Sequence, residues 1–245
     1  MKAIIIGAGI GGLAAAIALR KANIDVEIYE QVSEVREVGA GLSLWANALK
    51  ALDLLGLNDV IDSVTVPQID GGIRDQHGRL LAGGSMKDLE AKYGTLVVVA
   101  HRAELQAALL KALADAPVHL NKSLARFDQD ASGVTAHFED SSVVAGDVLI
   151  GADGIRSVVR AQLHGRQPPT YSGYSGWRAV IPFDPARVLA GETWVTARVL
   201  ARCQCKVIAC IGLQRSMHRK EIKARLAKST ICSMCFAAGI NPSKQ

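Results

Sequence analysis

The N-terminal stretch, residues 2–30, constrains the fold more than any other part of the chain. An apolar run at residues 3–6 predicts a buried strand, and it leads directly into the glycine-rich turn of residues 7–12. An apolar helical face follows, and a second apolar run at residues 26–29 ends immediately before Glu30. Strand, glycine turn, helix and strand in this order predict an α/β fold, with a Rossmann-like domain built on a mostly parallel sheet.

The turn has the G-x-G-x-x-G spacing at Gly7, Gly9 and Gly12. Gly7 permits the tight turn, Gly9 lets the backbone approach a pyrophosphate, and Gly12 lets the helix pack closely on the strand. The first helical N–H groups then face the phosphates, and Glu30, roughly 20 residues on, can accept hydrogen bonds from ribose hydroxyls. The alternative is a purely structural turn with a surface Glu30. The complete strand–turn–helix–acid context favours a dinucleotide site.

The length of 245 residues is enough for one large domain or two modest ones. The N-terminal apolar run is a strand followed by glycines and lacks the basic segment and cleavage site of a secretory signal. No uncharged stretch has the length of a transmembrane helix. We therefore expect a cytoplasmic protein without a membrane partner.

Apolar periodicity and turn residues predict the remaining elements. Helices are expected at residues 46–55, from residue 101 onward with Leu105, Leu109 and Leu113 on one face, and at 155–163. A hairpin is expected at 71–81, and strands are expected at 96–100, 118–120, 124–127, 134–138 and 147–150.

Charge and cysteine content change near Trp194. Residues 195–245 carry 10 of the 28 Lys and Arg residues, only Glu221 of the 23 acidic residues, and all five cysteines. The C-x-x-C at Cys232 and Cys235 has a zinc-type spacing, but a second such pair is missing, so no metal site is predicted. Residues 217–229 could form a basic helix for nucleic acid or a membrane surface. We favour a third interpretation, an out-of-frame or unrelated terminus.

Several motifs together resemble one family. The chain is similar to the single-component (class A) flavoprotein monooxygenases, which have the para-hydroxybenzoate hydroxylase fold, and most of all to salicylate hydroxylase-like members. The resemblance covers residues 1 to about 190 and rests, in order, on the N-terminal motif with Glu30, on Gly39-Ala40-Gly41-Leu42 followed by Asn47-Ala48, on Arg102, on Gly151-Ala152-Asp153-Gly154-Ile155-Arg156-Ser157, and on Tyr174-Ser175-Gly176-Trp177-Arg178.

The resemblance implies FAD as the bound dinucleotide and NADH or NADPH as the electron donor. Gly7, Gly9 and Gly12 would meet the pyrophosphate, and Glu30 the adenosine ribose. Arg102 would contact the phosphate or ribityl region, or be a solvated first-turn residue. The motif of Asp153 and Gly154 is associated with both cofactors, although Asp153 could also cap a helix. The other predicted cofactor-binding residues are Gly11, Arg36, Gly41 and Arg156, of which Arg36 could equally be an exposed loop residue and Arg156 could orient its segment or meet nicotinamide phosphates.

The resemblance further implies hydroxylation of a small aromatic substrate, phenolic or benzoate-like, with O2. Some relatives have a histidine base where this chain has Ser43, and serine is a poor general base at neutral pH. No catalytic residue is therefore predicted, and His101 is expected to pack locally. Substrate, catalytic base, choice between NADH and NADPH, and oligomeric state stay open.

Three regions are predicted: an FAD-binding domain at 1–168 with a β-hairpin insertion near 64–100 on the substrate side, the start of a β-rich substrate domain at 169–194, and the atypical tail at 195–245. The family's further Gly-Asp fingerprint is absent, so we expect a truncated chain with weak or no activity. A polyketide- or ubiquinone-type FAD hydroxylase or epoxidase would share these motifs. The alternative outside enzymes is a non-catalytic nucleotide-binding module whose basic tail contacts nucleic acid.

Overall fold

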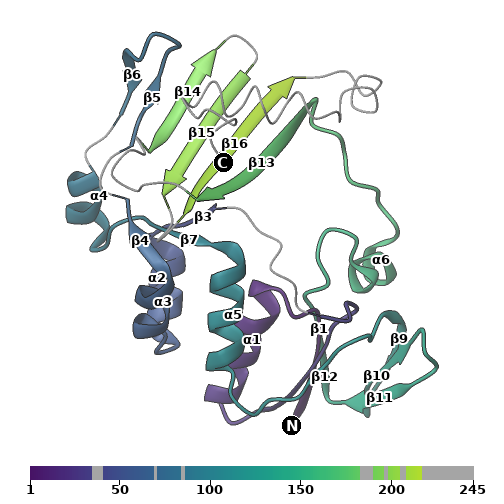
Figure 1. The fold of residues 1–245 in the computed structure, drawn as a ribbon. Helices are drawn as coiled ribbons and strands as arrows, with labels where there is room; N and C mark the ends of the chain where they lie inside the picture. The colour runs from purple at the N-terminus through teal and green to yellow at the C-terminus, as the bar shows by residue number, and fades with distance from the viewer. Residues whose placement is uncertain are drawn as a thin grey trace. The chain divides into compact units, whose positions relative to one another are not determined.

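The computed structural model describes residues 1–34, 41–68, 71–83, 86–182, 190–195, 198–204 and 208–216. The chain divides into two compact units (Figure 1). The first comprises Met1–Gly39, Asn47–Val64 and Arg102–Thr170, and the second comprises Ala40–Ala46, Thr65–His101 and Tyr171–Gln245. Each unit is therefore assembled from three separate segments.

A four-stranded parallel sheet forms the centre of the first unit, in the order β12-β1-β2-β8. The strands are β1 (Lys2–Ile6), β2 (Asp25–Tyr29), β8 (Val118–His119) and β12 (Val148–Gly151). Residues 3–6 of β1 and Ile28 are almost completely buried, as expected for a parallel sheet whose strands are near-continuous apolar runs.

Two helices, α1 (Ile10–Lys21) and α5 (Arg102–Ala112), lie side by side in this unit (Figure 1). Leu13 of α1 and Leu105 and Leu109 of α5 are at most 1% exposed. The unit also contains α3 (Asn58–Val64), α6 (Val158–His164) and nearly all of α2 (Ala46–Leu54).

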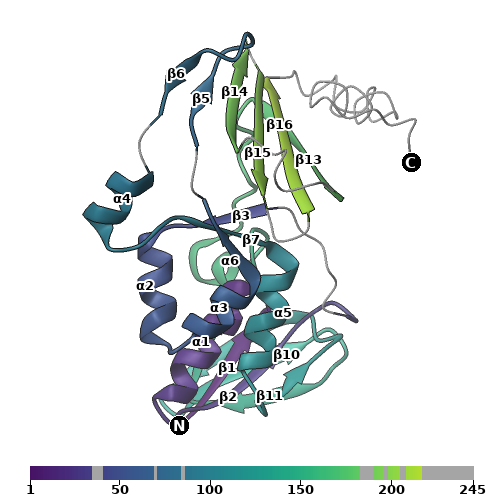
Figure 2. The ribbon, with the colours of Figure 1, turned by 60° about the vertical axis from the view of Figure 1, so that its left-hand side comes forward.

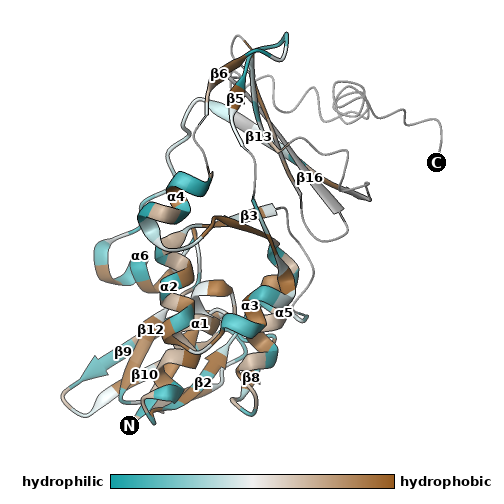
Figure 3. Ribbon diagram, turned by 90° about the vertical axis from the view of Figure 1, so that its left-hand side faces the viewer, coloured by the Kyte–Doolittle hydropathy of each residue, from teal (hydrophilic) through white to brown (hydrophobic). Residues whose placement is uncertain are grey.

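An antiparallel sheet in the order β11-β10-β9 completes the first unit. Its strands are β9 (Leu124–Asp130), β10 (Gly133–Phe138) and β11 (Val143–Gly146). Phe127 and Phe138 join Ile4, Ile6 and Tyr29 in one apolar cluster, so this sheet shares a core with the parallel one. Most residues of β9 are hydrophilic, whereas those of β12 and α1 are mostly hydrophobic (Figure 3).

The second unit contains two sheets. The smaller has the order β3-β7-β4, from β3 (Gly41–Leu44), β4 (Thr65–Pro67) and β7 (Val98–His101). The larger has six strands in the order β13-β16-β15-β14-β5-β6 (Figure 2). Its strands are β5 (Ile73–Arg74), β6 (Leu80–Ala82), β13 (Tyr174–Pro182), β14 (Gly191–Val195), β15 (Arg198–Gln204) and β16 (Ile208–Ser216). The same unit also contains the helix α4 (Met86–Tyr93).

Strands β5 and β14 meet through a backbone approach that leaves no room for a side chain at Gly191. Glu192 N–H donates to the Gly72 carbonyl at 2.9 Å, and the two strands pair in parallel from there. Gly191 has φ +125°, and a Cβ on it would lie 2.5 Å from the same carbonyl oxygen. Only glycine fits here without a shift of the backbone.

The predicted α/β class with a parallel sheet is confirmed, and the predicted helices, hairpin and strands are present, with bounds that differ by one to three residues at most ends. The sequence did not predict the helices α3 and α4. It also did not predict the strands β15 and β16, both of which lie within residues 195–245, the region expected to be atypical. Residues 217–245 lie outside the described residues, so the basic helix and the C-x-x-C pair stay predictions. The predicted domain bounds also stay predictions.

Candidate dinucleotide-binding site

The glycine-rich turn lies at the carboxyl edge of the parallel sheet, between its neighbours on both sides. Gly7 N–H donates to the Tyr29 carbonyl at 2.8 Å, and Ala152 N–H donates to the Ile6 carbonyl at 2.8 Å. Gly7 has φ +107°, and a Cβ there would lie 2.5 Å from the Ala152 oxygen. The turn therefore depends on a glycine at this position, and the carboxyl edge is where open α/β sheets bind ligands.

The four glycines of the turn face two different environments. A Cβ on Gly12 would lie 1.9 Å from the Gly7 oxygen, so Gly12 allows α1 to pack against the turn. A Cβ on Gly9 or Gly11 would meet no heavy atom of the described residues within 4 Å. Gly9 is also the N-cap of α1, and no side chain in the described part of the chain caps this end of the helix. Free helical N–H groups beside open space fit a pyrophosphate.

Glu30 follows β2 and binds the turn itself. Its Oε2 accepts from Ala8 N–H at 2.7 Å, and its Oε1 accepts from Val32 N–H at 3.2 Å. A carboxylate oxygen can accept more than one hydrogen bond, so acceptor capacity for ribose hydroxyls remains. The predicted ribose contact stays a prediction, and the bond from Glu30 to Ala8 was not foreseen.

A cluster of polar and aromatic side chains supports the end of β2. The Tyr29 hydroxyl donates to Glu27, whose carboxylate is also 2.9 Å from the Lys2 ammonium. The Tyr29 ring stacks on His119 with centroids 4.7 Å apart. Burial raises the pKa of the Tyr29 phenol above its usual value, and the Glu27 carboxylate raises it further. Burial opposes ionisation of Glu27, but the bonds from Tyr29 and Lys2 hold the pKa of its carboxyl below the usual value. Tyr29 thus stays a neutral donor beside an ionised acceptor.

Asp153 has a structural role in α6. Its Oδ2 accepts from Val158 N–H at 2.6 Å and from Val159 N–H at 3.3 Å, which caps the helix from four residues before its N-cap, Ser157. Its Oδ1 is buried and has no hydrogen-bond partner in the described structure. Such an orphaned acceptor is costly, and a ligand hydroxyl would satisfy it. Asp153 therefore does cap the helix, with Oδ2, and its Oδ1 remains without a hydrogen-bond partner among the described residues.

Arg102 opens α5, and both it and Arg156 are exposed. Gly154 has φ +78° in the turn before α6. Sequence reasoning missed Gln106, which lies one helical turn after Arg102: its Nε2 donates to the Ala8 carbonyl at 2.8 Å. No sequence signal for this contact exists, because a glutamine on a helix is ordinarily a surface residue.

Two other predicted residues are not brought to this turn by any described contact. Arg36 lies outside the described residues. Gly41 belongs to the second unit, where it pairs with His101 across β3 and β7. Ser43 is exposed on the same strand and pairs with Val99. The cofactor-binding roles of Arg36 and Gly41 stay predictions.

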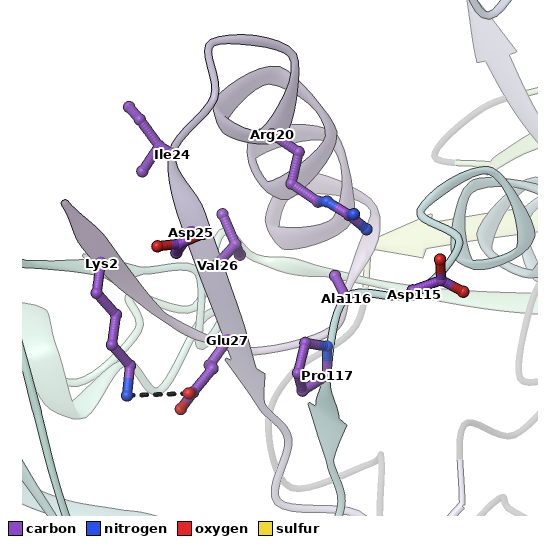
Figure 4. Close-up of a pocket in the computed structure, with 9 residues that line it drawn as sticks. All are labelled: Lys2, Arg20, Ile24, Asp25, Val26, Glu27, Asp115, Ala116 and Pro117. Carbon is purple, nitrogen blue, oxygen red and sulfur yellow. Dashed lines mark ion pairs between the residues drawn. The ribbon is translucent and has the colours of Figure 1, made fainter.

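A hollow of about 360 Å³ lies at the other end of the parallel sheet (Figure 4). It is lined by Lys2, Arg20, Ile24, Asp25, Val26, Glu27, Asp115, Ala116 and Pro117. These residues include the amino ends of β1 and β2, opposite the edge at which such sheets bind ligands. Lys2 and Glu27 form an ion pair there, and none of the lining residues belongs to the glycine turn.

Within the described ranges, no helix is long and apolar enough to cross a membrane, and no three His, Cys, Asp or Glu side chains come together as metal ligands.

Comparison with known proteins identifies the family of the chain. Residues 1–225 match the family model described as an FAD binding domain. The chain is 38% identical over 198 residues to the FAD-dependent urate hydroxylase of Klebsiella pneumoniae subsp. pneumoniae, which covers 80% of this chain and 51% of that protein. It is 36% identical over 180 residues to the 6-hydroxynicotinate 3-monooxygenase of Bordetella bronchiseptica, covering 73% of this chain and 47% of that protein.

Among solved structures, Klebsiella pneumoniae HpxO in complex with FAD and uric acid superposes with a TM-score of 0.85 at 31% identity, covering 99% of this chain and 63% of the other. The 2,6-dihydroxypyridine-3-hydroxylase of Arthrobacter nicotinovorans shares the fold, with a TM-score of 0.72 at 22% identity over 89% of this chain and 57% of the other. The chain spans about half the length of the curated relatives it matches. The chain belongs to the FAD binding domain family of flavoprotein monooxygenases, as its motifs predicted.

Proposed function

We propose that this chain is the FAD-binding part of a monooxygenase that hydroxylates a small aromatic or heteroaromatic compound with NADH or NADPH and O2. The observation that carries the proposal is the glycine turn. It lies at the carboxyl edge of a parallel sheet, with open space at Gly9 and Gly11 beside the uncapped start of α1. The 38% identity to a urate hydroxylase extends this from dinucleotide binding to hydroxylation.

The residues of the first unit fit FAD. Gly7, Gly9, Gly11 and Gly12 would admit its pyrophosphate to the N–H groups of α1, and the open acceptor sites of Glu30 would meet the adenosine ribose. The free Oδ1 of Asp153 offers a buried acceptor on the adjacent strand end. Other predicted contacts are those of Arg36, Gly41, Arg102, Gly154 and Arg156.

The protein supplies binding and orientation, whereas bound FAD supplies the capacity to take a hydride from NAD(P)H and deliver activated oxygen to an aromatic carbon. Glu30 and the α1 N–H groups hold the adenosine half and leave the reacting end to other residues. No side chain is assigned as catalytic base, and Ser43 is not one.

The substrate class follows from the relatives. Two of the relatives are named after urate and 6-hydroxynicotinate, which are planar nitrogen heterocycles that carry oxygen substituents. We propose a substrate of this kind or a phenolic acid.

The test compares wild type with Gly9→Val. Gly9 has φ −70° and ψ 175°, which valine adopts easily, and its Cβ would meet no heavy atom of the described residues within 4 Å. We expect the valine to fill the phosphate space and raise the Kd for FAD at least about tenfold in a fluorescence titration. The cost to folding, measured by thermal unfolding without FAD, should be at most about 1 kcal/mol, since valine is a poor N-cap.

Activity is measured on the same samples as NADH and NADPH oxidation with urate, 6-hydroxynicotinate and a phenolic acid. Wild type that binds no FAD would overturn the proposal. FAD binding without substrate-stimulated oxidation is the expected result for the FAD-binding part alone, and substrate-stimulated oxidation would show that this part retains turnover.

A further inference from the structure

Both backbone polar groups of Ala8 are held by side chains that arrive from different elements. Its N–H donates to Glu30 Oε2 at 2.7 Å, from the end of β2. Its carbonyl accepts from Gln106 Nε2 at 2.8 Å, from α5. Ala8 is 0% exposed, so water does not substitute for either partner. The centre of the glycine turn is thus fixed from two sides.

The bond to Gln106 also decides where the next amide points. The Ala8 carbonyl and the Gly9 N–H belong to one planar trans peptide, in which the two groups point in opposite directions. With the carbonyl turned to Gln106, the Gly9 N–H points away from α5. No described residue accepts a hydrogen bond from this N–H, and the position of a Gly9 Cβ is open.

Helix α5 is well placed to hold this orientation because it is fixed against α1 at both ends. Gln106 contacts Ala8 just before α1 begins, and Arg20 Nη1 near the end of α1 donates to the Leu113 carbonyl just after α5 at 2.6 Å. The helices therefore run parallel, and Leu13, Leu105 and Leu109 are buried in this unit. A side chain on such a helix has little freedom to follow a change in the turn.

We propose that Gln106 is a positioning residue: it orients the peptide between Ala8 and Gly9 so that the Gly9 N–H faces a phosphate oxygen of the dinucleotide. The inference rests on the proposed function for the identity of the ligand. Gln106 does not touch the ligand. It acts through a single backbone carbonyl.

The test variant is Gln106→Leu, which keeps most of the side-chain volume and removes the donor. The buried Ala8 carbonyl then lacks a partner, and the peptide rotates to find one, which turns the Gly9 N–H out of position. The expected result is a rise of about tenfold in the Kd for both FAD and ADP, measured by fluorescence quenching and calorimetry. ADP is the decisive probe because it contains only the adenosine pyrophosphate half.

Gln162→Leu is the matched control. Gln162 also binds backbone with both amide atoms: its Oε1 accepts from Phe127 N–H at 3.0 Å and its Nε2 donates to the Phe127 carbonyl at 2.5 Å. It lies in α6 and makes no described contact with the glycine turn. This variant should lose comparable stability on heating and keep the wild-type Kd for ADP.

Hydrogen–deuterium exchange without ligand supplies a readout independent of binding. Faster exchange in the peptide spanning residues 7–13, in Gln106→Leu only, supports the inference. Unchanged exchange there in Gln106→Leu would overturn the inference. If the wild type binds ADP, an unchanged Kd for ADP in Gln106→Leu would overturn it as well. A wild type that binds neither ADP nor FAD defeats the proposed function instead, and exchange still decides whether Gln106 holds the turn.

Discussion

At the scale of single residues, neighbouring glycines of the turn differ sharply in what they tolerate. A Cβ on Gly12 would lie 1.9 Å from a backbone oxygen, whereas a Cβ on Gly11 would meet nothing within 4 Å. The two are adjacent in the first turn of α1, so the local helix is the same for both. The difference is therefore one of tertiary contact alone.

Substitution by alanine separates the two positions. Gly12→Ala should destabilise the protein by about 3 kcal/mol or more, at or above the upper end for overpacking, because the obstructing atom is backbone. Gly11→Ala should stabilise it by about 0.5–1 kcal/mol, since alanine loses less conformational entropy in a helix than glycine. Chemical denaturation of both variants without FAD measures the difference. Equal effects would mean that Gly12 does not face the turn as described.

At the scale of elements, α6 has two caps with separable roles. Ser157 accepts from Arg160 N–H at 2.9 Å, and Asp153 accepts from Val158 N–H while keeping Oδ1 free. Both residues stabilise the start of the helix. Only Asp153 has an acceptor left for another partner.

Alanine at either cap should cost about 1 kcal/mol of unfolding free energy. If the free oxygen of Asp153 binds FAD, Asp153→Ala also raises the Kd for FAD, while Ser157→Ala leaves the Kd unchanged. Thermal unfolding and FAD titration of the two variants test this. Equal FAD affinity in both would show that Asp153 is only a cap.

The antiparallel sheet of the first unit carries a pH-dependent contact. A hydrogen bond from Lys122 and further bonds from Ser142 hold the pKa of Asp140 well below its usual value. A carboxyl with a lowered pKa in the folded state stabilises the fold above its unfolded pKa, near 3.8, and this contribution is lost as the pH falls below that value.

Asp140→Asn should therefore lower the thermal midpoint relative to wild type at neutral pH. The gap between the two should shrink as the pH falls from about 5 to about 2, because wild type then loses the same interaction. Added salt should also narrow the gap at neutral pH, since the pair is exposed. A gap that is constant with pH would assign the effect to packing.

The elements that sequence predicted are those with a strong local signal. The apolar run of β1, the glycines and the buried leucines of α5 were sufficient for the parallel unit. Helix α4 was missed because no residue in it is buried, and β16 because its position among cysteines and cations hid an apolar run. Of the site, the glycines and Glu30 were identifiable from spacing, whereas the Gln106 contact spans 98 residues and needs the packing of α5 on α1.

At the scale of the whole molecule, the chain alternates between its two units instead of completing one first. The larger sheet joins the early hairpin of β5 and β6 to the late strands β13–β16. Contacts between residues this far apart in sequence close long loops, which slows folding more than it lowers stability. We expect refolding probes in the second unit to report later formation than probes in β1 and β2.

Stopped-flow refolding with pulsed hydrogen exchange would check this order. Amides of β1 and β2, separated by only one helix, should be protected first, and those of β5 and β14 last. Simultaneous protection would indicate a single cooperative step for both units.

The close approach of Gly72 and Gly191 has a consequence for recombination between relatives. Because β14 reaches β5 only through a backbone contact that excludes a side chain, strands β13–β16 from another protein are compatible with this hairpin only if they bring a glycine at the position of Gly191. Exchange of the late strands alone therefore divides the sheet between β5 and β14, where the backbone contact requires a glycine. A hybrid that folds should therefore take the β5–β6 hairpin and the strands β13–β16 from the same parent, although two separate stretches of the gene encode them.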